Sequence, residues 1–159
     1  MYEGFGPEKI AIIVEALTDN KNRTASNIRT IFQKNGGNLG ESGVASHQFK
    51  QAGVIRISKK EISDNDILEL AINGGADDCS STNMYHEIIT AKDNFYKVKL
   101  EIKKKINEFI SSGIEWLPIN KILLDKEKTT SVVNFLEILE DDDDVQYVYA
   151  NLDIESNSI

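Results

Sequence analysis

The spacing of apolar and polar positions in the first quarter of the chain predicts a buried strand followed by an amphipathic helix. Residues 9–18 (KIAIIVEALT) are mostly apolar and rich in β-branched side chains, which is typical of a buried strand. Thr24 suits a helix N-cap, and apolar residues follow at helical spacing: Ala25, Ile28, Ile31 and Phe32. Asn35, Gly36 and Gly37 predict the end of this helix, because glycine adopts the left-handed conformation of a Schellman cap.

The same patterns predict an alternation of strands and helices along the rest of the chain. The strands are expected at 44–49 and 53–58 as a hairpin around 50–53, at 76–79 as a short strand, and at 84–90, 114–122 and 145–152. The helices are expected from Ser63 or Asp64 to Gly74, over 91–113 and over 131–140.

The order of these elements predicts an α+β fold made of two ferredoxin-like βαββαβ units, one inserted into the other. Residues 52–119 complete one unit, and residues 1–51 together with 120–155 form the discontinuous second unit. No sequence repeat at a fixed period accompanies this division, which follows from element order alone.

Charge is distributed unevenly along the chain, which has 159 residues and a net charge of -8. Residues 20–40 hold four basic residues and no acid, so the remainder carries -12, the difference between -8 and +4. An overall acidic field repels phosphate, which argues against non-specific coating of nucleic acid. Any nucleic-acid contact is therefore expected to be local, at residues 20–40 first and then at a lysine cluster: Lys97, Lys99, Lys103, Lys104 and Lys105.

The predicted basic helix and the glycine-rich segment after it are the first candidate site. Arg23, Arg29 and Lys34 offer charge and forked donors to phosphate, and Gly36, Gly37 and Asn38 let backbone N–H groups approach it. The alternative is structural: the glycines end a helix and the cations solvate its outer face. The segment is not a P-loop, because the Lys-Ser/Thr pair is absent and it follows a helix instead of opening one.

The acidic run Asp141, Asp142, Asp143 and Asp144 is the second candidate, as a surface for a basic protein partner. It lacks the spaced ligands and glycine of an EF-hand. A solvated acidic loop is the plainer interpretation.

No residues are spaced for catalysis, a cofactor or a metal. His47, His86 and Cys79 make no spaced metal set, and no nucleophile elbow surrounds either histidine. Asp77 and Asp78 precede Cys79 and discourage a reactive thiolate. The longest early apolar run is far shorter than a membrane span, no secretory pattern opens the chain, and a single cysteine fits a reducing compartment. A cytoplasmic, non-enzymatic protein without a cofactor is therefore expected.

The segment YEGFGPEKIAIIVEALTDNKNRTASNIRTIFQKNGGNLGESG resembles the middle-region signature of the YebC family, relatives of the mitochondrial translational activator of cytochrome oxidase. GGADD and LEDDDDVQYVYANLD resemble its later motifs. The resemblance implies two α+β domains and a regulator of gene expression, acting on DNA in transcription or at the ribosome in translation. It also implies a functional role for Arg23, Arg29, Lys34 and Asn38.

Three departures from the family pattern accompany the resemblance. The family's basic helical first domain has no counterpart here, since the chain starts at the motif that normally follows it. GPEKIA replaces the family's Gly-Pro-Gly-Gly, which makes the entry to the first predicted strand less permissive and more charged. VASHQF puts polar His47 and Gln48 into a strand that is usually more apolar.

The expected function is therefore gene regulation through nucleic-acid or ribosome contact, with no membrane partner. Two rivals remain open: a protein-interaction module that uses the acidic run, and a small phosphate-chemistry enzyme that uses Arg23 or Arg29 with the GGNLG loop. The enzyme is the weaker rival, because neither a general base nor a nucleophile is evident.

Overall fold

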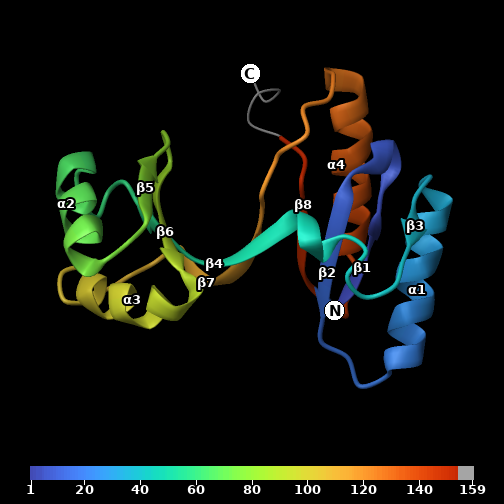
Figure 1. Cartoon of the computed structure of the whole chain (residues 1–159), viewed down its shortest axis with the longest axis horizontal. Helices are drawn as coiled ribbons and strands as arrows, with labels where there is room; N and C mark the ends of the chain where they lie inside the picture. The colour runs from blue at the N-terminus through green and yellow to red at the C-terminus, as the bar shows by residue number, and fades with distance from the viewer. Residues whose placement is uncertain (154–159) are drawn as a thin grey trace. The chain divides into compact units, whose positions relative to one another are not determined.

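The computed structural model describes residues 1–153 and divides the chain into two compact units (Figure 1). Unit 1 comprises Met1–Lys50 and the described residues from Leu117 onward, and unit 2 comprises Gln51–Trp116. Each unit contains a four-stranded sheet and two α-helices. The predicted class, α+β with two such units and one inserted in the other, is confirmed. The predicted end of the discontinuous unit at residue 155 lies outside the described residues.

Unit 1 has the sheet order β3-β1-β2-β8, with antiparallel pairing at each of its strand junctions. Its strands are β1 (Tyr2–Phe5), β2 (Ala11–Ala16), β3 (Asn38–Leu39) and β8 (Val145–Ala150), and its helices are α1 (Lys21–Lys34) and α4 (Lys126–Glu140). Two 3₁₀ turns, Pro7–Lys9 and Ser46–Gln48, complete it.

The core of unit 1 forms where α1 and α4 pack on the same face of the sheet. Phe32 of α1 and Phe135 of α4 meet edge to face with ring centroids 5.1 Å apart, and both are buried. Ile12 and Val14 supply the β2 side of this cluster. The alternation along β2 therefore fixes which face receives the helices.

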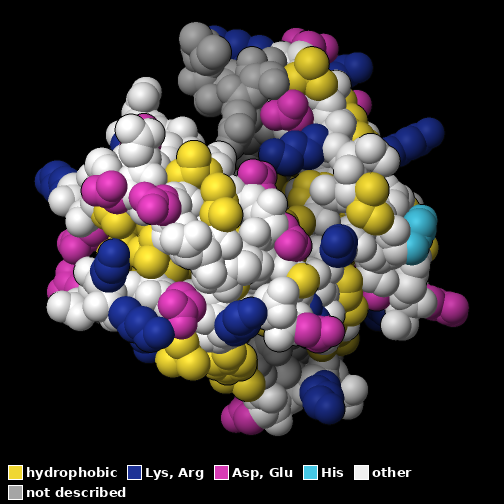
Figure 2. Space-filling model, turned by 60° about the vertical axis from the view of Figure 1, so that its left-hand side comes forward, with side chains coloured by type: hydrophobic (Ala, Val, Ile, Leu, Met, Phe, Trp, Pro, Cys, Tyr) yellow, Lys and Arg dark blue, Asp and Glu magenta, His cyan; other side chains and the backbone are white. Residues whose placement is uncertain are grey.

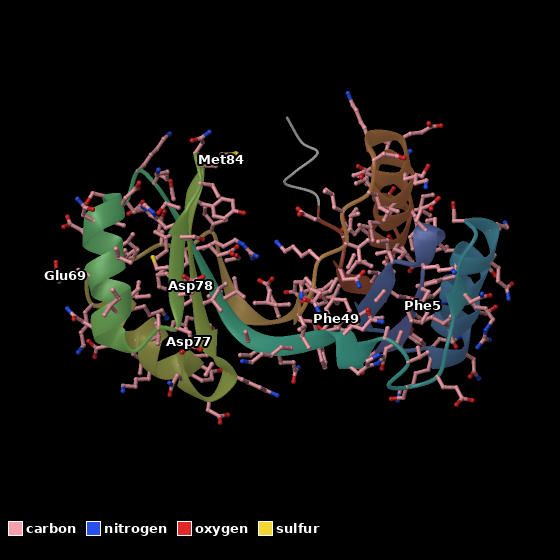
Figure 3. The ribbon with its side chains drawn as sticks, turned by 45° about the horizontal axis from the view of Figure 1, so that its top comes forward. Phe5, Phe49, Glu69, Asp77, Asp78 and Met84 are labelled. Atoms are coloured by element: carbon pink, nitrogen blue, oxygen red, sulfur yellow. The ribbon has the colours of Figure 1, made fainter. Side chains whose placement is uncertain are left out.

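Unit 2 has the element order βαββαβ and the sheet order β5-β6-β4-β7, as in a ferredoxin-like fold. Its strands are β4 (Phe49–Ser58), β5 (Asp78–Ser81), β6 (Tyr85–Ala91) and β7 (Ser111–Pro118), and its helices are α2 (Asp64–Gly74) and α3 (Phe95–Lys103). A third 3₁₀ turn, Lys92–Asn94, precedes α3. Figure 3 shows Glu69 on the outer side of α2 and Met84 at the tip of the β5–β6 hairpin.

The predicted hairpin at 44–58 is wrong, because β4 is one continuous strand. Gly53 pairs with Thr90 inside the β4–β6 ladder, and a Cβ there would overlap the Thr90 hydroxyl and the Phe95 ring. Glycine is needed at position 53 because the Thr90 and Phe95 side chains pack against its backbone. The chain does not turn there. Residues 44–48, the first half of the predicted hairpin, form turns and the second 3₁₀ segment instead.

The predicted long helix over 91–113 is also wrong. Helix α3 ends at Lys103, and β7 begins at Ser111. Gly113 has low helix propensity, and residues 111–113 belong to β7, which pairs with β4 at the edge of the sheet. The strand β1 was not predicted. With it, unit 1 contains the same kinds of element as unit 2 in a different order along the chain, ββαβαβ instead of βαββαβ.

The departure GPEKIA has a structural consequence at the entry to β2. Glu8 and Lys9 both have a φ of +61°, a left-handed conformation that costs a non-glycine residue roughly 1–2 kcal/mol. These are the positions where the family pattern has a pair of glycines.

Within residues 1–153, no helix combines the length and apolar character needed to cross a bilayer.

Candidate nucleic-acid interface

Helix α1 begins at Lys21 because the Asn20 side chain accepts a hydrogen bond from the Arg23 N–H at 3.0 Å. The prediction of Thr24 as N-cap is wrong. Thr24 is fully buried, and its hydroxyl lies 2.8 Å from an Asp144 carboxylate oxygen and 3.1 Å from the Asn20 carbonyl oxygen. Sequence reasoning failed here because both residues suit a cap, and the partner of Thr24 is 120 positions away.

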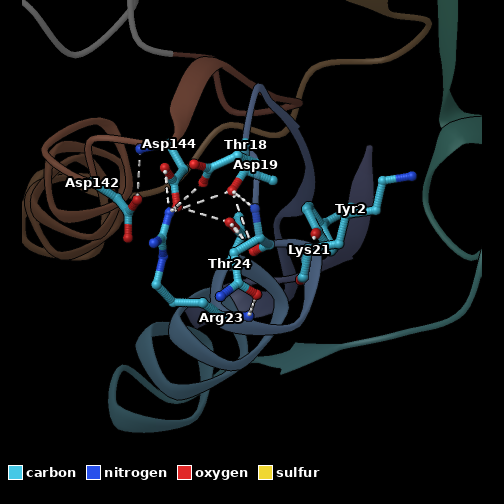
Figure 4. A network of polar contacts seen from close by, with 9 residues as sticks. Tyr2, Thr18, Asp19, Lys21, Arg23, Thr24, Asp142 and Asp144 are labelled. Carbon is cyan, nitrogen blue, oxygen red and sulfur yellow. Dashed lines mark hydrogen bonds and ion pairs between the residues drawn. The ribbon is translucent and has the colours of Figure 1, made fainter.

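Arg23 is held by acidic residues at the start of α1 (Figure 4). Its Nη2 atom lies 3.2 and 3.3 Å from the two carboxylate oxygens of Asp144 and 3.5 Å from Asp19. The hydrogen bond from Thr24 and then the Arg23 contact hold the pKa of Asp144 below its usual value. Asp144 in turn raises the pKa of Arg23. The predicted basic and acidic sites therefore meet at this ion pair, which leaves the Arg23 side chain half exposed.

Arg29 and Lys34 occupy a different environment. Both are exposed, and within residues 1–153 neither side chain has a hydrogen-bond or ion-pair partner. Thr24, Ile28 and Phe32 bury one side of the helix. At about 100° per residue, Arg29 lies beside one edge of that side and Lys34 beyond its other edge. These two cations thus remain available to an external anion.

The glycines after α1 form the predicted Schellman cap. Gly36 has a φ of +80°, and the Gly37 N–H donates to the Phe32 carbonyl oxygen at 2.8 Å. Gly37 is buried against β1, where a Cβ would overlap the Phe5 carbonyl oxygen. Asn38 is exposed and pairs with Phe5 in the sheet. Of the three loop positions, Gly36 and Asn38 face solvent, and the Gly37 N–H serves the cap.

A buried carboxylate, which the sequence analysis missed, orders the segment that follows. Glu3 on β1 is 3% exposed, and its oxygens accept hydrogen bonds from the N–H groups of Gly43, Ala45 and Ser46 at 2.9, 3.1 and 2.7 Å. Burial raises the pKa of Glu3, but these three donors outweigh it and leave the pKa below its usual value. These three N–H groups resemble an anion-binding nest, and the Glu3 carboxylate occupies it in place of an external anion.

The acidic run divides into inward-facing and outward-facing residues. Asp144 binds Arg23 and Thr24, and an Asp142 carboxylate oxygen accepts the Asp144 N–H at 2.9 Å. Asp141 and Asp143 are exposed. All four line one groove with Arg23 and Asn27.

Catalytic groups are not assembled among the described residues. Ser81 Oγ lies 2.7 Å from His86 Nδ1, but Asp64 approaches the same nitrogen at 3.7 Å while Nε2 contacts the Ile62 carbonyl oxygen at 2.8 Å. A triad needs its acid and its nucleophile on opposite ring nitrogens. Burial and the neighbouring Asp78 and Asp64 raise the pKa of Cys79. Within residues 1–153, no three His, Cys, Asp or Glu side chains gather as metal ligands.

Comparison with known proteins identifies the family. Residues 1–152 match the family described as TACO1/YebC second and third domain. The chain belongs to the TACO1/YebC family. A probable transcriptional regulatory protein of Pelagibacter ubique (strain HTCC1062) is 58% identical over 156 residues, which is 98% of this chain and 65% of that protein. A probable transcriptional regulatory protein of Rickettsia felis (strain ATCC VR-1525 / URRWXCal2) is 47% identical over 154 residues, 96% of this chain and 61% of that protein.

One solved structure shares the fold of this chain. The crystal structure of a conserved hypothetical protein, Aq1575 from Aquifex aeolicus, superposes with a TM-score of 0.89 at 40% identity over 96% of this chain and 63% of that one. The chain thus spans less than two thirds of the length of each of these three relatives.

Proposed function

We propose that this chain forms part of a non-enzymatic regulator of gene expression that contacts nucleic-acid phosphates through the outer face of α1. The observation that carries the proposal is the pair of exposed cations, Arg29 and Lys34, without a partner among residues 1–153 in a chain of net charge -8. The relatives' name, probable transcriptional regulatory protein, supports the same class of function.

The roles within the proposed site differ from residue to residue. Arg29 and Lys34 pair with phosphates directly. Gly36 and Asn38 let a phosphate come close to the backbone at the C-terminal end of α1. Gly37 holds the turn through its bond to Phe32. Arg23 joins only when a phosphate replaces Asp144. Such contacts position nucleic acid without reading its sequence.

The test is co-sedimentation of the chain with purified ribosomes at two salt concentrations, with binding of a 20-base-pair DNA duplex measured in parallel. Arg29→Ala with Lys34→Ala removes two phosphate contacts, which lowers the slope of log affinity against log salt by about 1.4 for single-stranded and about 1.8 for duplex targets. Lys121→Ala with Lys126→Ala is the matched control, because it removes the same charge at two exposed positions of unit 1.

If ribosome binding is lost in Arg29→Ala/Lys34→Ala and retained in the control, the target is the ribosome and the function is in translation. If only binding to the DNA duplex is lost in that variant and retained in the control, the target is DNA. Unchanged affinity and unchanged slope on both targets would exclude this site.

A second candidate function is docking of a basic protein partner on Asp141 and Asp143. Their exposure beyond the end of α4 favours it, since the other two acids of the run are engaged within the chain. Asp141→Asn with Asp143→Asn is expected to weaken capture of a basic partner when nucleic acid has been digested away. Equal capture by the variant would remove this candidate.

A further inference from the structure

The lysine cluster of unit 2 forms a second basic surface at α3. Residues 92–105 contain six lysines and two acids, Asp93 and Glu101, which gives this segment a net charge of +4. Lys97, Lys99 and Lys103 lie on the helix, and Lys104 and Lys105 follow it directly. The segment matches α1 in local charge and belongs to the other unit.

Two apolar side chains lie at the centre of the solvent-facing side of α3. Tyr96 is 74% exposed and Leu100 is 62% exposed, one helical turn apart. Phe95, Val98 and Ile102 bury the opposite side of the helix. At about 100° per residue, Lys99 and Lys103 flank one edge of the Tyr96–Leu100 stripe, while Lys97 and Lys104 flank the other.

Neighbouring side chains hold part of this surface in place. The Tyr96 and Phe95 rings pack edge to face, with their centroids 5.4 Å apart and an interplanar angle of 64°. The Lys99 ammonium lies 5.6 Å from the centre of the Phe95 ring. Glu101 engages Lys104 at 2.8 Å, whereas Lys97 and Lys103 have no ion-pair or hydrogen-bond partner among the described residues. The Tyr96 ring is thus held in an exposed position next to lysines that an external anion can reach. In the lower half of Figure 2, Lys and Arg side chains border exposed hydrophobic ones.

We infer that this face of α3 binds an unpaired segment of nucleic acid, with a base stacked on Tyr96 and phosphates paired by Lys97, Lys99 and Lys103. Charge complementarity selects the occupant, because a +4 surface on a -8 protein favours a polyanion. An exposed aromatic ring flanked by lysines matches a single strand in particular, since unpaired bases stack on aromatic side chains and paired bases do not offer their faces. The inference rests on the proposed function of nucleic-acid contact, but it uses a different unit and different residues.

The experiment measures affinity of the 159-residue chain for a fluorescent 12-nucleotide oligo(U) and for a 12-base-pair RNA duplex. Tyr96→Leu is expected to weaken oligo(U) binding about fivefold or more while Tyr96→Phe retains it, because stacking needs the ring and not the hydroxyl. Duplex binding is expected to be equal in both variants. Lys99→Gln with Lys103→Gln is expected to lower the oligo(U) salt slope by about 1.4, and Lys121→Gln with Lys126→Gln is the matched charge control.

The outcomes separate this inference from the proposed α1 site. Oligo(U) binding that is lost in the α3 variants and unchanged in Arg29→Gln/Lys34→Gln supports the α3 inference and leaves the α1 site to its own test on ribosomes and the DNA duplex. Oligo(U) binding that is lost in Arg29→Gln/Lys34→Gln and unchanged in the α3 variants overturns the α3 inference and supports α1. Equal oligo(U) affinity of Tyr96→Leu and the parent chain overturns base stacking. If Tyr96→Leu instead reduces binding to vesicles of 30% phosphatidylserine in phosphatidylcholine and leaves oligo(U) unchanged, the surface is a lipid contact and the inference is wrong.

Discussion

Replacement of Glu3 by glutamine should destabilise unit 1 and loosen the segment that Glu3 orders. The carboxylate accepts three backbone N–H groups, those of Gly43, Ala45 and Ser46. Glutamine keeps one acceptor oxygen and turns the other into a donor, so at least one N–H loses its partner and faces an N–H group. Hydrogen bonds to a charged acceptor contribute about 1.5–3 kcal/mol each. The two surviving bonds become neutral ones, worth about 0.5–1.5 kcal/mol each, so the hydrogen bonds alone would lose about 3.5–6 kcal/mol. The neutral amide costs less to bury than the carboxylate, and we therefore expect a net loss of about 2–3 kcal/mol in the free energy of unfolding.

The effect should depend on pH with a definite sign. The pKa of Glu3 is lower in the folded chain than its usual value, so its contribution to stability is fully present above the unfolded pKa and disappears as the pH falls through the folded one. The difference between the parent chain and Glu3→Gln should therefore be largest near pH 7 and should shrink below about pH 4, around the unfolded pKa of glutamate.

Urea unfolding followed by far-ultraviolet circular dichroism at pH 7 and pH 3.5 measures this difference. At pH 7, thermal unfolding should shift by roughly 5–10 °C, and amide exchange should accelerate at Gly43, Ala45 and Ser46. Glu41→Gln is the matched control, an exposed glutamate in the same segment. Equal stability of Glu3→Gln and the parent chain at pH 7, or an undiminished difference at pH 3.5, would refute the reasoning.

Three further changes test other contacts. Asp144→Asn keeps an acceptor for Thr24 but releases Arg23. Nucleic-acid binding should therefore gain one phosphate contact, its salt slope should steepen by about 0.7–0.9, and the melting temperature should fall. An unchanged slope would contradict the shielding of Arg23 by Asp144. Arg56 binds Glu115 at 2.7 and 3.2 Å and Glu87 at 3.0 Å, so Arg56→Gln should cost about 1–3 kcal/mol in urea unfolding, partly restored by Glu115→Gln. Lys9→Gly should raise stability by about 0.5–1 kcal/mol through relief of its positive φ, and no gain would show that the strain is absent.

Local signals in the sequence were sufficient for some helix ends, among them both ends of α2 and the C-terminal end of α1. The Gly36–Gly37 cap follows from the identity of adjacent residues, and so does Ser63, whose side chain accepts the Asp66 N–H at the start of α2. Both motifs are complete within a few positions, so no tertiary contact was needed to predict them.

Longer-range contacts explain the errors. Gly53 was interpreted as a turn residue, but Thr90 and Phe95 require it to lack a side chain within a continuous strand. Glu3 and the segment it orders lie about forty positions apart, and the Arg23–Asp144 pair spans 121 positions. A single sequence records neither pairing, because each residue is equally compatible with an exposed position.

The charge pattern of the chain determines how the binding experiments should be interpreted. The Debye length is about 8 Å at physiological ionic strength, so α1 or α3 presents mainly its own cations to a nearby phosphate there. At 0.01 M salt the length grows to about 30 Å, and the acidic remainder of the chain then repels the same phosphate. Release of counterions strengthens binding as salt falls, while this repulsion weakens it. The slope that reports the number of phosphate contacts should therefore be taken between about 0.1 and 0.3 M salt, where screening confines the interaction to the local surface.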